Sequence, residues 1–249
     1  MKNLKGKSNA ESLFKINEIP SDNQIRNILD TVAPQNLYPI FSDCYTKLDQ
    51  SGHLESYRFF EDYLLVAIDG TEYFRSQKIN CPNCTVTKHK NGKISYSHKV
   101  LTPVITQPGS NKVIPLEPEF VTPQDGSKKQ DCELNAAKRW IERNAHMAEQ
   151  KVIILGDDLF SNEPFCKQLL CKGFHFILVC KPDSHKTLYE YLNGNDSIKT
   201  ISTRRWNGKF HELIKVRYCN DLPIKDGENV LPAILKTGIN DILKLGVVF

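Results

Sequence analysis

The stretch Leu64–Thr71 reads Leu-Leu-Val-Ala-Ile-Asp-Gly-Thr, and it decides the fold that we expect for this chain. Five consecutive apolar residues are typical of a short strand that is buried on both faces, and the run stops at Asp69. A second stretch, Val152–Asp158, repeats the pattern, because an apolar run again ends in glycine and carboxylate, here Asp157 and Asp158. The sequence therefore predicts two buried strands that each end at an aspartate.

These two strands lead to a hypothesis about a metal site. If they are neighbours in a sheet, Asp69 and Asp157 lie at the same edge, and two close negative charges are most readily tolerated around a divalent cation. The alternative is that each aspartate only ends a strand and caps the turn that follows. The sequence alone leaves both interpretations open.

The overall composition sets few limits on function. The chain has 249 residues, of which 40% are hydrophobic and 25% charged, as is ordinary for a globular protein. Its formal net charge of +4 permits nucleic-acid binding without requiring it. No apolar run approaches the roughly 18 residues of a membrane span, and the basic N-terminus lacks the apolar core of a signal peptide. We expect a cytoplasmic protein without membrane association, whose eight cysteines are reduced.

Residues 1–58 are expected to form a helical region. Ser21 and Gln24 have the spacing of a capping box, which predicts a helix ending at Pro34. A second amphipathic helix is expected to end at Gly52. Two short helices before the core form a candidate DNA-contacting region, and a plain packing subdomain is the other interpretation.

Residues 79–98 form an insertion that is rich in cysteine and histidine. Cys81, Cys84, His89 and His98 have the spacing Cys-x2-Cys-x4-His-x8-His. Two thiolates and two imidazoles suit tetrahedral Zn²⁺, although the spacing between the histidines does not match a common zinc finger. A tight turn with two free thiols is the alternative.

The order of the expected elements predicts the fold class. After the first strand come a hairpin, a helix from its N-cap Asp131 to about Ala148, the second buried strand, a helix that Asn162 caps and Gly173 ends, and a third buried strand at Phe174–Val179. The basic residues Lys138, Arg139 and Arg143 are expected on the solvated face of the first of these helices. Residues 59–185 are thus predicted to be an α/β core, a ribonuclease H-like mixed sheet with flanking helices in which the first and fourth strands lie side by side.

The C-terminal part is predicted to hold a β insertion and an aberrant tail. Residues 186–228 contain a short helix and a hairpin that turns on Asn207–Gly208, a strong two-residue turn signal. Residues 229–249 have no clear hydrophobic period and no evident place to pack.

Several motifs resemble one family when taken in order. The chain resembles bacterial insertion-sequence transposases of the Asp-Asp-Glu class, close to the insertion sequence 4 group. The motifs lie at Ala67–Thr71, Gln124–Gly126, Gln130–Glu133, Lys138–Trp140, Leu155–Phe160 and Cys180–His185.

The resemblance implies a function, cofactors and partners. Such transposases use Mg²⁺ (or Mn²⁺), held by two aspartates and a glutamate, to cut and rejoin DNA. It implies Asp69 as the first ligand, Asp157 as the second and Asp158 as a fallback. It also implies that the partners are the transposon ends and either a second copy of the chain or an intact transposase.

The chain departs from the family at the third carboxylate. The family's glutamate signature, on a helix beyond the β insertion, is missing, and neither Glu163 nor Glu212 suits the role. We therefore expect a chain truncated at its C-terminus and inactive alone. A noncatalytic DNA- or zinc-binding remnant, and a metal-dependent nuclease or phosphatase that uses Asp69, Asp157 and Asp158, are the other hypotheses.

Overall fold

The structure is a computed structural model that describes residues 12–13, 15, 20–59, 62–123, 130–193, 199–206, 208–223, 230–237 and 244–248. The chain divides into two compact units, residues 1–44 and 45–249. The predicted boundary after residue 58 differs from this division, because the residues after Cys44 already belong to the second unit. Leu54, for example, is completely buried in its core.

Both helices predicted for the N-terminal region are present, and neither contains a fully buried residue. Helix α2 (Asp22–Leu29) begins with the expected capping box, in which Ser21 and Gln24 exchange side-chain and backbone hydrogen bonds. Helix α3 (Tyr38–Gln50) crosses the boundary between the units and precedes Gly52, as predicted. Ile28 and Leu29 of α2 are each 61% exposed.

The second unit is a mixed α/β structure. A 3-10 helix, His53–Tyr57, precedes its first strand. The strands up to the first helix of the core are β1 (Arg58–Phe59), β2 (Tyr63–Ala67), β3 (Gly70–Ser76), β4 (Thr85–Lys88), β5 (Ile94–Leu101), β6 (Val104–Thr106), β7 (Ile114–Pro115) and β8 (Glu119–Phe120). The elements that follow are α4 (Glu133–Arg143), β9 (Val152–Gly156), α5 (Glu163–Cys171), β10 (His175–Cys180), α6 (Lys186–Asn193), β11 (Lys199–Trp206), β12 (His211–Pro223), β13 (Val230–Thr237) and β14 (Lys244–Val248).

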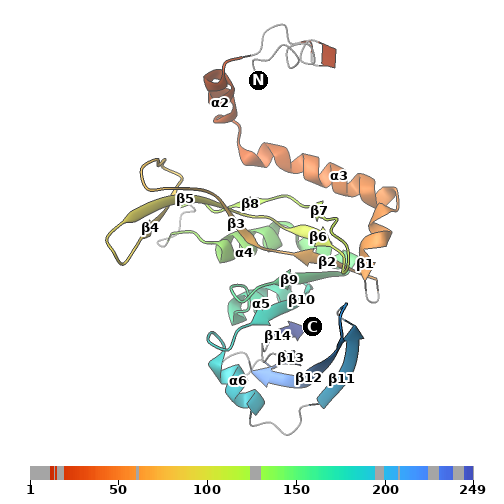
Figure 1. The fold of residues 1–249 in the computed structure, drawn as a ribbon. Helices are drawn as coiled ribbons and strands as arrows, with labels where there is room; N and C mark the ends of the chain where they lie inside the picture. The colour runs from red at the N-terminus through yellow and green to blue at the C-terminus, as the bar shows by residue number, and fades with distance from the viewer. Residues whose placement is uncertain are drawn as a thin grey trace. The chain divides into compact units, whose positions relative to one another are not determined.

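The main sheet contains the two strands that the sequence singled out. Its central order is β7-β6-β2-β9-β10. Strands β2, β9 and β10 are parallel to one another, whereas β6 is antiparallel to β2 and β7 is antiparallel to β6. Strands β3, β5, β4 and β8 form a second sheet. Only Ile68 and Asp69 separate β2 from β3, and only Thr102 and Pro103 separate β5 from β6. Strands β2 and β3 therefore form one arm of a long antiparallel hairpin and β5 and β6 the other arm, and this hairpin runs through both sheets (Figure 1). Asp69 lies where the chain passes from one sheet to the other.

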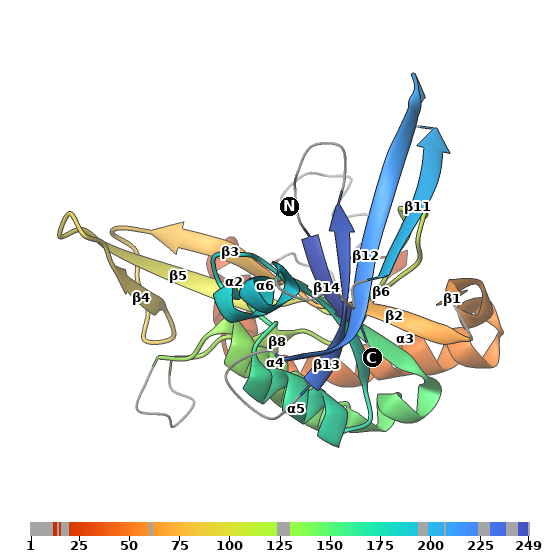
Figure 2. The ribbon, with the colours of Figure 1, turned by 90° about the horizontal axis from the view of Figure 1, so that it is seen from below.

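Helices α4 and α5 lie next to each other (Figure 2). Gln168 of α5 donates a hydrogen bond of 3.1 Å to the carbonyl oxygen of Lys138 in α4. Their apolar sides and the strands enclose the core, whose largest side chains are fully or almost fully buried. These side chains are Trp140, Phe160, Phe165, Phe174 and Phe176. At roughly 25 cal/mol per Å² of apolar surface, such aromatic residues contribute a large share of the stability of the unit.

The helix boundaries agree with the sequence at α5 and differ at α4. Asn162 caps α5, since its Oδ1 accepts a hydrogen bond from the amide of Phe165, and Gly173 follows the helix with a φ of 78°. The predicted N-cap of α4 was wrong, because the N-cap is Cys132 and the side chain of Asp131 bonds elsewhere. Helix α4 also ends at Arg143, and a 3-10 helix, Ala145–Gln150, completes the segment.

The C-terminal residues take part in the main sheet. The predicted hairpin is β11 and β12, with Gly208 at a φ of 98°, while Asn207 lies outside the described residues. The expectation that residues 229–249 have no place to pack was wrong for their described part. Strand β13 pairs with β12, and β14 pairs with both β13 and β10. Among the described residues, no helix is long and apolar enough to cross a membrane.

Candidate functional site

Asp69 and Asp157 follow neighbouring parallel strands at the same position. Ala67 of β2 is paired with Leu155 of β9, and each aspartate lies two residues beyond this pair. The ladder continues past the last pair, because the amide of Ile68 donates to the carbonyl oxygen of Leu155 at 2.9 Å. Since adjacent strands are about 4.8 Å apart, the structure brings the two aspartates to one edge of the sheet.

The carboxylates of both aspartates are exposed and make local hydrogen bonds. Oδ1 of Asp69 accepts from the amide of Gly70 at 2.8 Å, and Oδ1 of Asp157 accepts from the amide of Leu159 at 3.0 Å. The backbone of Asp69 is fixed as well, because its carbonyl oxygen accepts from the amide of Thr102. Hard oxygen donors on rigid strand ends fit a Mg²⁺ or Mn²⁺ ion, which prefers carboxylate oxygens.

Asp158 has a different environment from Asp157. Its Oδ1 accepts a hydrogen bond of 2.6 Å from the amide of Lys181, and its Oδ2 accepts one of 2.6 Å from the hydroxyl of Ser184. Nε2 of His185 lies 3.4 Å from Oδ1. Asp158 therefore ties the turn after β9 to the loop after β10, whereas the side chain of Asp157 is exposed.

The imidazole of His185 is part of the same connection. It is buried, and its Nε2 lies 2.8 Å from the hydroxyl of Ser161. Burial lowers the pKa of His185, while the carboxylate of Asp158 opposes this shift. The segment that the sequence identified as Cys180–His185 thus contributes contacts that hold the end of β9 in place.

The sequence did not single out Glu133 as a site residue. Its carboxyl group lies directly against Gly70, the residue after Asp69, so that a Cβ added at Gly70 would come within 2.3 Å of the Cδ atom of Glu133. Oε1 of Glu133 forms an ion pair of 2.8 Å with Nζ of Lys99. The signal for this contact in the sequence was Gly70, a small residue directly after a strand-ending aspartate. The sequence did not show that helix α4 would pack against Gly70.

Within the part of the chain that the structure describes, Asp69 and Asp157 belong to no group of three or more His, Cys, Asp or Glu side chains whose ligand atoms lie within 4.8 Å of one another. The sole group of three or more side chains there with ligand atoms within 4.8 Å of one another consists of Cys81, Cys84 and His98. Glu163 forms an ion pair with Lys167 on the surface of α5. The side chain of Glu212 and the Gln124–Gly126 motif both lie outside the part of the chain that the structure describes.

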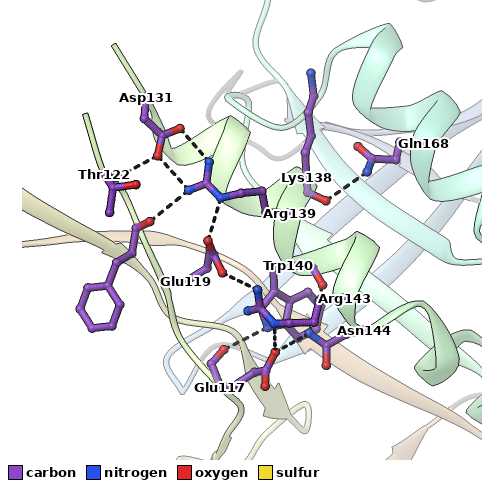
Figure 3. A network of polar contacts seen from close by, with 11 residues as sticks. Glu117, Glu119, Thr122, Asp131, Lys138, Arg139, Trp140, Arg143, Asn144 and Gln168 are labelled. Carbon is purple, nitrogen blue, oxygen red and sulfur yellow. Dashed lines mark hydrogen bonds and ion pairs between the residues drawn. The ribbon is translucent and has the colours of Figure 1, made fainter. Parts of the chain in front are cut away.

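Two of the three basic side chains of α4, those of Arg139 and Arg143, are bound to acidic residues, which corrects the expectation that they lie on a solvated face (Figure 3). Arg139 forms ion pairs of 2.8 Å with Asp131 and with Glu119. Arg143 bonds Glu117 at 2.6 Å and Glu119 at 2.8 Å. These contacts fix α4 against β8 and the segment before it, so they position the helix that carries Glu133.

Asp131 is the least exposed member of this network, since its side chain has no accessible surface. Burial on its own would raise the pKa of Asp131, but the hydrogen bonds from Arg139 and from the amide of Thr122 outweigh burial and lower it. The same contacts with Asp131 raise the pKa of Arg139. Removing one partner from such a pair would leave a buried charge without compensation.

Three of the four predicted zinc ligands converge. The two sulfur atoms of Cys81 and Cys84 are 3.6 Å apart, and Nε2 of His98 lies 3.3 Å and 3.4 Å from them. These three residues could hold a metal ion such as Zn²⁺. His89 does not join them, because its Nε2 is bonded to the hydroxyl of Ser95 at 2.8 Å, so the four-ligand prediction was wrong at this position.

Comparisons with known proteins add little to this geometry. No family model matches the chain, and no curated protein matches it either. One similar solved structure is the NurA nuclease from Sulfolobus solfataricus, with 12% sequence identity over 92% of this chain and 82% of that chain and a TM-score of 0.27. A TM-score this low carries no argument about function.

Proposed function

We propose that the chain is a transposase-derived protein with a ribonuclease H-like core, in which Asp69 and Asp157 hold a divalent metal ion for DNA cleavage. One observation carries this proposal: strands β2 and β9 are parallel neighbours in a register that takes both aspartates to the same edge. The order β7-β6-β2-β9-β10, with an antiparallel first half and a parallel second half, supports a ribonuclease H-like fold.

The chemistry follows from the ligand set. Two exposed carboxylates at a sheet edge can hold a hard cation that polarises a phosphodiester and activates a water molecule or a 3′-hydroxyl group. A site with two carboxylates instead of three binds the ion less tightly and positions it less well. We therefore propose that this chain is inactive alone in strand transfer, and that activity would require a further carboxylate.

A cleavage assay tests the proposal. Purified protein is incubated with supercoiled DNA carrying the element's ends, in the presence of Mg²⁺ or Mn²⁺, and nicked and joined products are separated on a gel. We expect no strand transfer. Titration with Mn²⁺, followed by the paramagnetic relaxation of water protons, should show one weak site that Asp69→Asn and Asp157→Asn each weaken at least about tenfold.

Two outcomes contradict this proposal. Mn²⁺ binding that is unaffected by both substitutions would remove the aspartate pair as a metal site. Robust end-specific joining that depends on Asp69 would show that a third ligand is supplied after all. The matched control is Asp183→Asn, because Asp183 is an exposed aspartate that follows a different strand, β10.

A noncatalytic DNA-binding remnant is the second candidate function. Arg26 of α2 and Lys47 of α3 are exposed and are therefore available to DNA phosphates. Gel-shift binding to transposon ends without metal-dependent cleavage, weakened by Arg26→Glu and Lys47→Glu, would favour this function. Binding that is insensitive to both charge reversals would leave the helices with a packing role only. Sedimentation of the chain, alone and mixed with an intact transposase, tests pairing with a second copy or with such a partner.

A further inference from the structure

We infer that Cys81, Cys84 and His98 form a zinc site that does not use His89. This inference is independent of the proposed function, because it concerns other residues and a different sheet. His98 lies opposite Phe74 in the β3–β5 pairing, four residues along β3 from Gly70. At about 3.3 Å per residue this separation is roughly 13 Å, so the zinc site and the aspartate pair would hold separate ions.

The separations among the three ligand atoms match those around a tetrahedral zinc ion. With Zn–S bonds of about 2.3 Å and a Zn–N bond of about 2.1 Å, tetrahedral angles place two sulfur atoms about 3.8 Å apart and sulfur and nitrogen about 3.6 Å apart. The structure has 3.6 Å between the sulfur atoms, and 3.3 Å and 3.4 Å between sulfur and nitrogen. A disulfide requires about 2.05 Å, which is far shorter than the observed sulfur separation.

The backbone between the two cysteines holds their sulfur atoms close together. The amide of Cys84 donates to the carbonyl oxygen of Cys81 at 3.1 Å, which closes a tight turn. The amide of Cys81 in turn donates to the sulfur of Cys84 at 3.3 Å. These two bonds hold the sulfur atoms of Cys81 and Cys84 3.6 Å apart without an ion.

Aromatic neighbours hold the imidazole of His98 in place. The ring of Tyr73 stacks on it with a centroid distance of 5.8 Å and an interplanar angle of 15°, and the ring of Phe74 lies 5.5 Å away. A ligand whose orientation is fixed in advance loses less conformational entropy when the ion binds. Softer sulfur and imidazole ligands in a tetrahedral arrangement favour zinc over magnesium or calcium.

The zinc ion would connect the segment between β3 and β4 to β5. Cys81 and Cys84 lie just before β4, whereas His98 lies within β5. The segment from residue 77 to residue 84 has no strand or helix of its own, so the ion would anchor it to the sheet. His89 lies beyond this point, in the β4–β5 connection, where its bond to Ser95 gives it a separate structural role.

Metal analysis of the full chain tests the inference. Protein loaded with Zn²⁺ under reducing conditions and then dialysed should retain one zinc per chain. Cys81→Ser, Cys84→Ser and His98→Ala should each lower zinc affinity at least about tenfold, while His89→Ala, the matched control, should retain one zinc per chain. Loss of zinc by His89→Ala comparable with that of His98→Ala would overturn the three-residue assignment.

A second measurement uses the unmodified chain, because a cysteine variant could fail to fold. Co²⁺ added in place of Zn²⁺ should give the intense visible bands of a tetrahedral ion and the charge-transfer band of cobalt thiolate. Cys81 is exposed and Cys84 is buried. Zn²⁺ should therefore protect Cys81 from alkylation at least about tenfold relative to zinc-free protein. A wild-type chain that keeps no zinc and shows no tetrahedral cobalt spectrum would refute the inference.

Discussion

The carboxyl group of Glu133, at the start of α4, lies against Gly70, so that a side chain at Gly70 would come within 2.3 Å of it. We expect Gly70→Ala to displace Glu133 and break its ion pair with Lys99. The cost should be about 1–2 kcal/mol, since overpacking costs about 1–3 kcal/mol and the displaced group is the end of a flexible side chain. Urea unfolding of both proteins measures the difference.

A double substitution provides the control for this prediction. Glu133→Ala removes the group that Gly70→Ala would meet, so the double variant should lose less stability than the sum of the two single variants. A coupling energy of about 1 kcal/mol would confirm the contact. Strict additivity would contradict it.

Asp158 and Asp157 should respond differently to the same substitution. Asp158→Asn replaces one of two carboxylate oxygens that accept bonds from the amide of Lys181 and from the hydroxyl of Ser184, so we expect a loss of about 1–3 kcal/mol. Asp157→Asn should change stability by less than about 0.5 kcal/mol, because the Asp157 side chain is exposed. Thermal unfolding without metal separates the two, and an equal loss in both variants would argue against the separate roles.

The Asp131–Arg139 ion pair predicts a specific dependence on pH. The pKa of Asp131 is lowered in the folded protein, so the carboxylate stabilises the fold above its unfolded pKa of about 3.9. This contribution is lost as the pH falls through the lower pKa of the folded state. Asp131→Asn should cost about 2–4 kcal/mol near pH 7, and its difference from the wild type should shrink below about pH 4.

Urea titrations at several pH values between 7 and 2.5 measure this difference. Asp183→Asn removes a negative charge from an exposed side chain and serves as the matched control. A difference between the wild type and Asp131→Asn that stays constant down to pH 2.5 would show that the carboxylate of Asp131 does not contribute through its charge.

The sequence predicts the central strands well because their apolar runs leave few alternatives. Strands β2, β9 and β10 coincide with the runs at Leu64, Val152 and Phe174, and α5 with its cap and its terminal glycine. Strands β3 and β4 were missed. In β3, intermediate and exposed residues alternate, and only the first residue of β4 is buried, so neither has the apolar run that identified the others.

Candidate ligands were predicted correctly where they are close together in the sequence, or where they directly follow an apolar run that marks a strand. The Cys81–Cys84 pair and both aspartates meet this condition. His89 was included by residue type, although its bond to Ser95 depends on the geometry of the β4–β5 connection. The roles of Arg139 and Arg143 could not be predicted, because their acidic partners Glu119 and Glu117 lie 20 and 26 residues earlier in the chain and meet them only after folding.

The pairing of β14 with β10 predicts that the C-terminal residues stabilise the sheet. Residues Ile177–Cys180 of β10 are paired with Leu245–Val248 of β14. A chain ending at residue 228 would leave that edge of β10 without a partner, and open edges exchange amide hydrogens faster and promote association.

Hydrogen exchange followed by mass spectrometry tests this prediction. We expect exchange in a peptide covering Ile177–Cys180 to be at least about tenfold faster in the shortened chain. A peptide covering Leu64–Ala67 is the internal control, because β2 keeps both of its neighbours, β9 and β6. Equal protection of β10 in the two chains would mean that the last residues do not pair with it, as expected for a tail that has no place to pack.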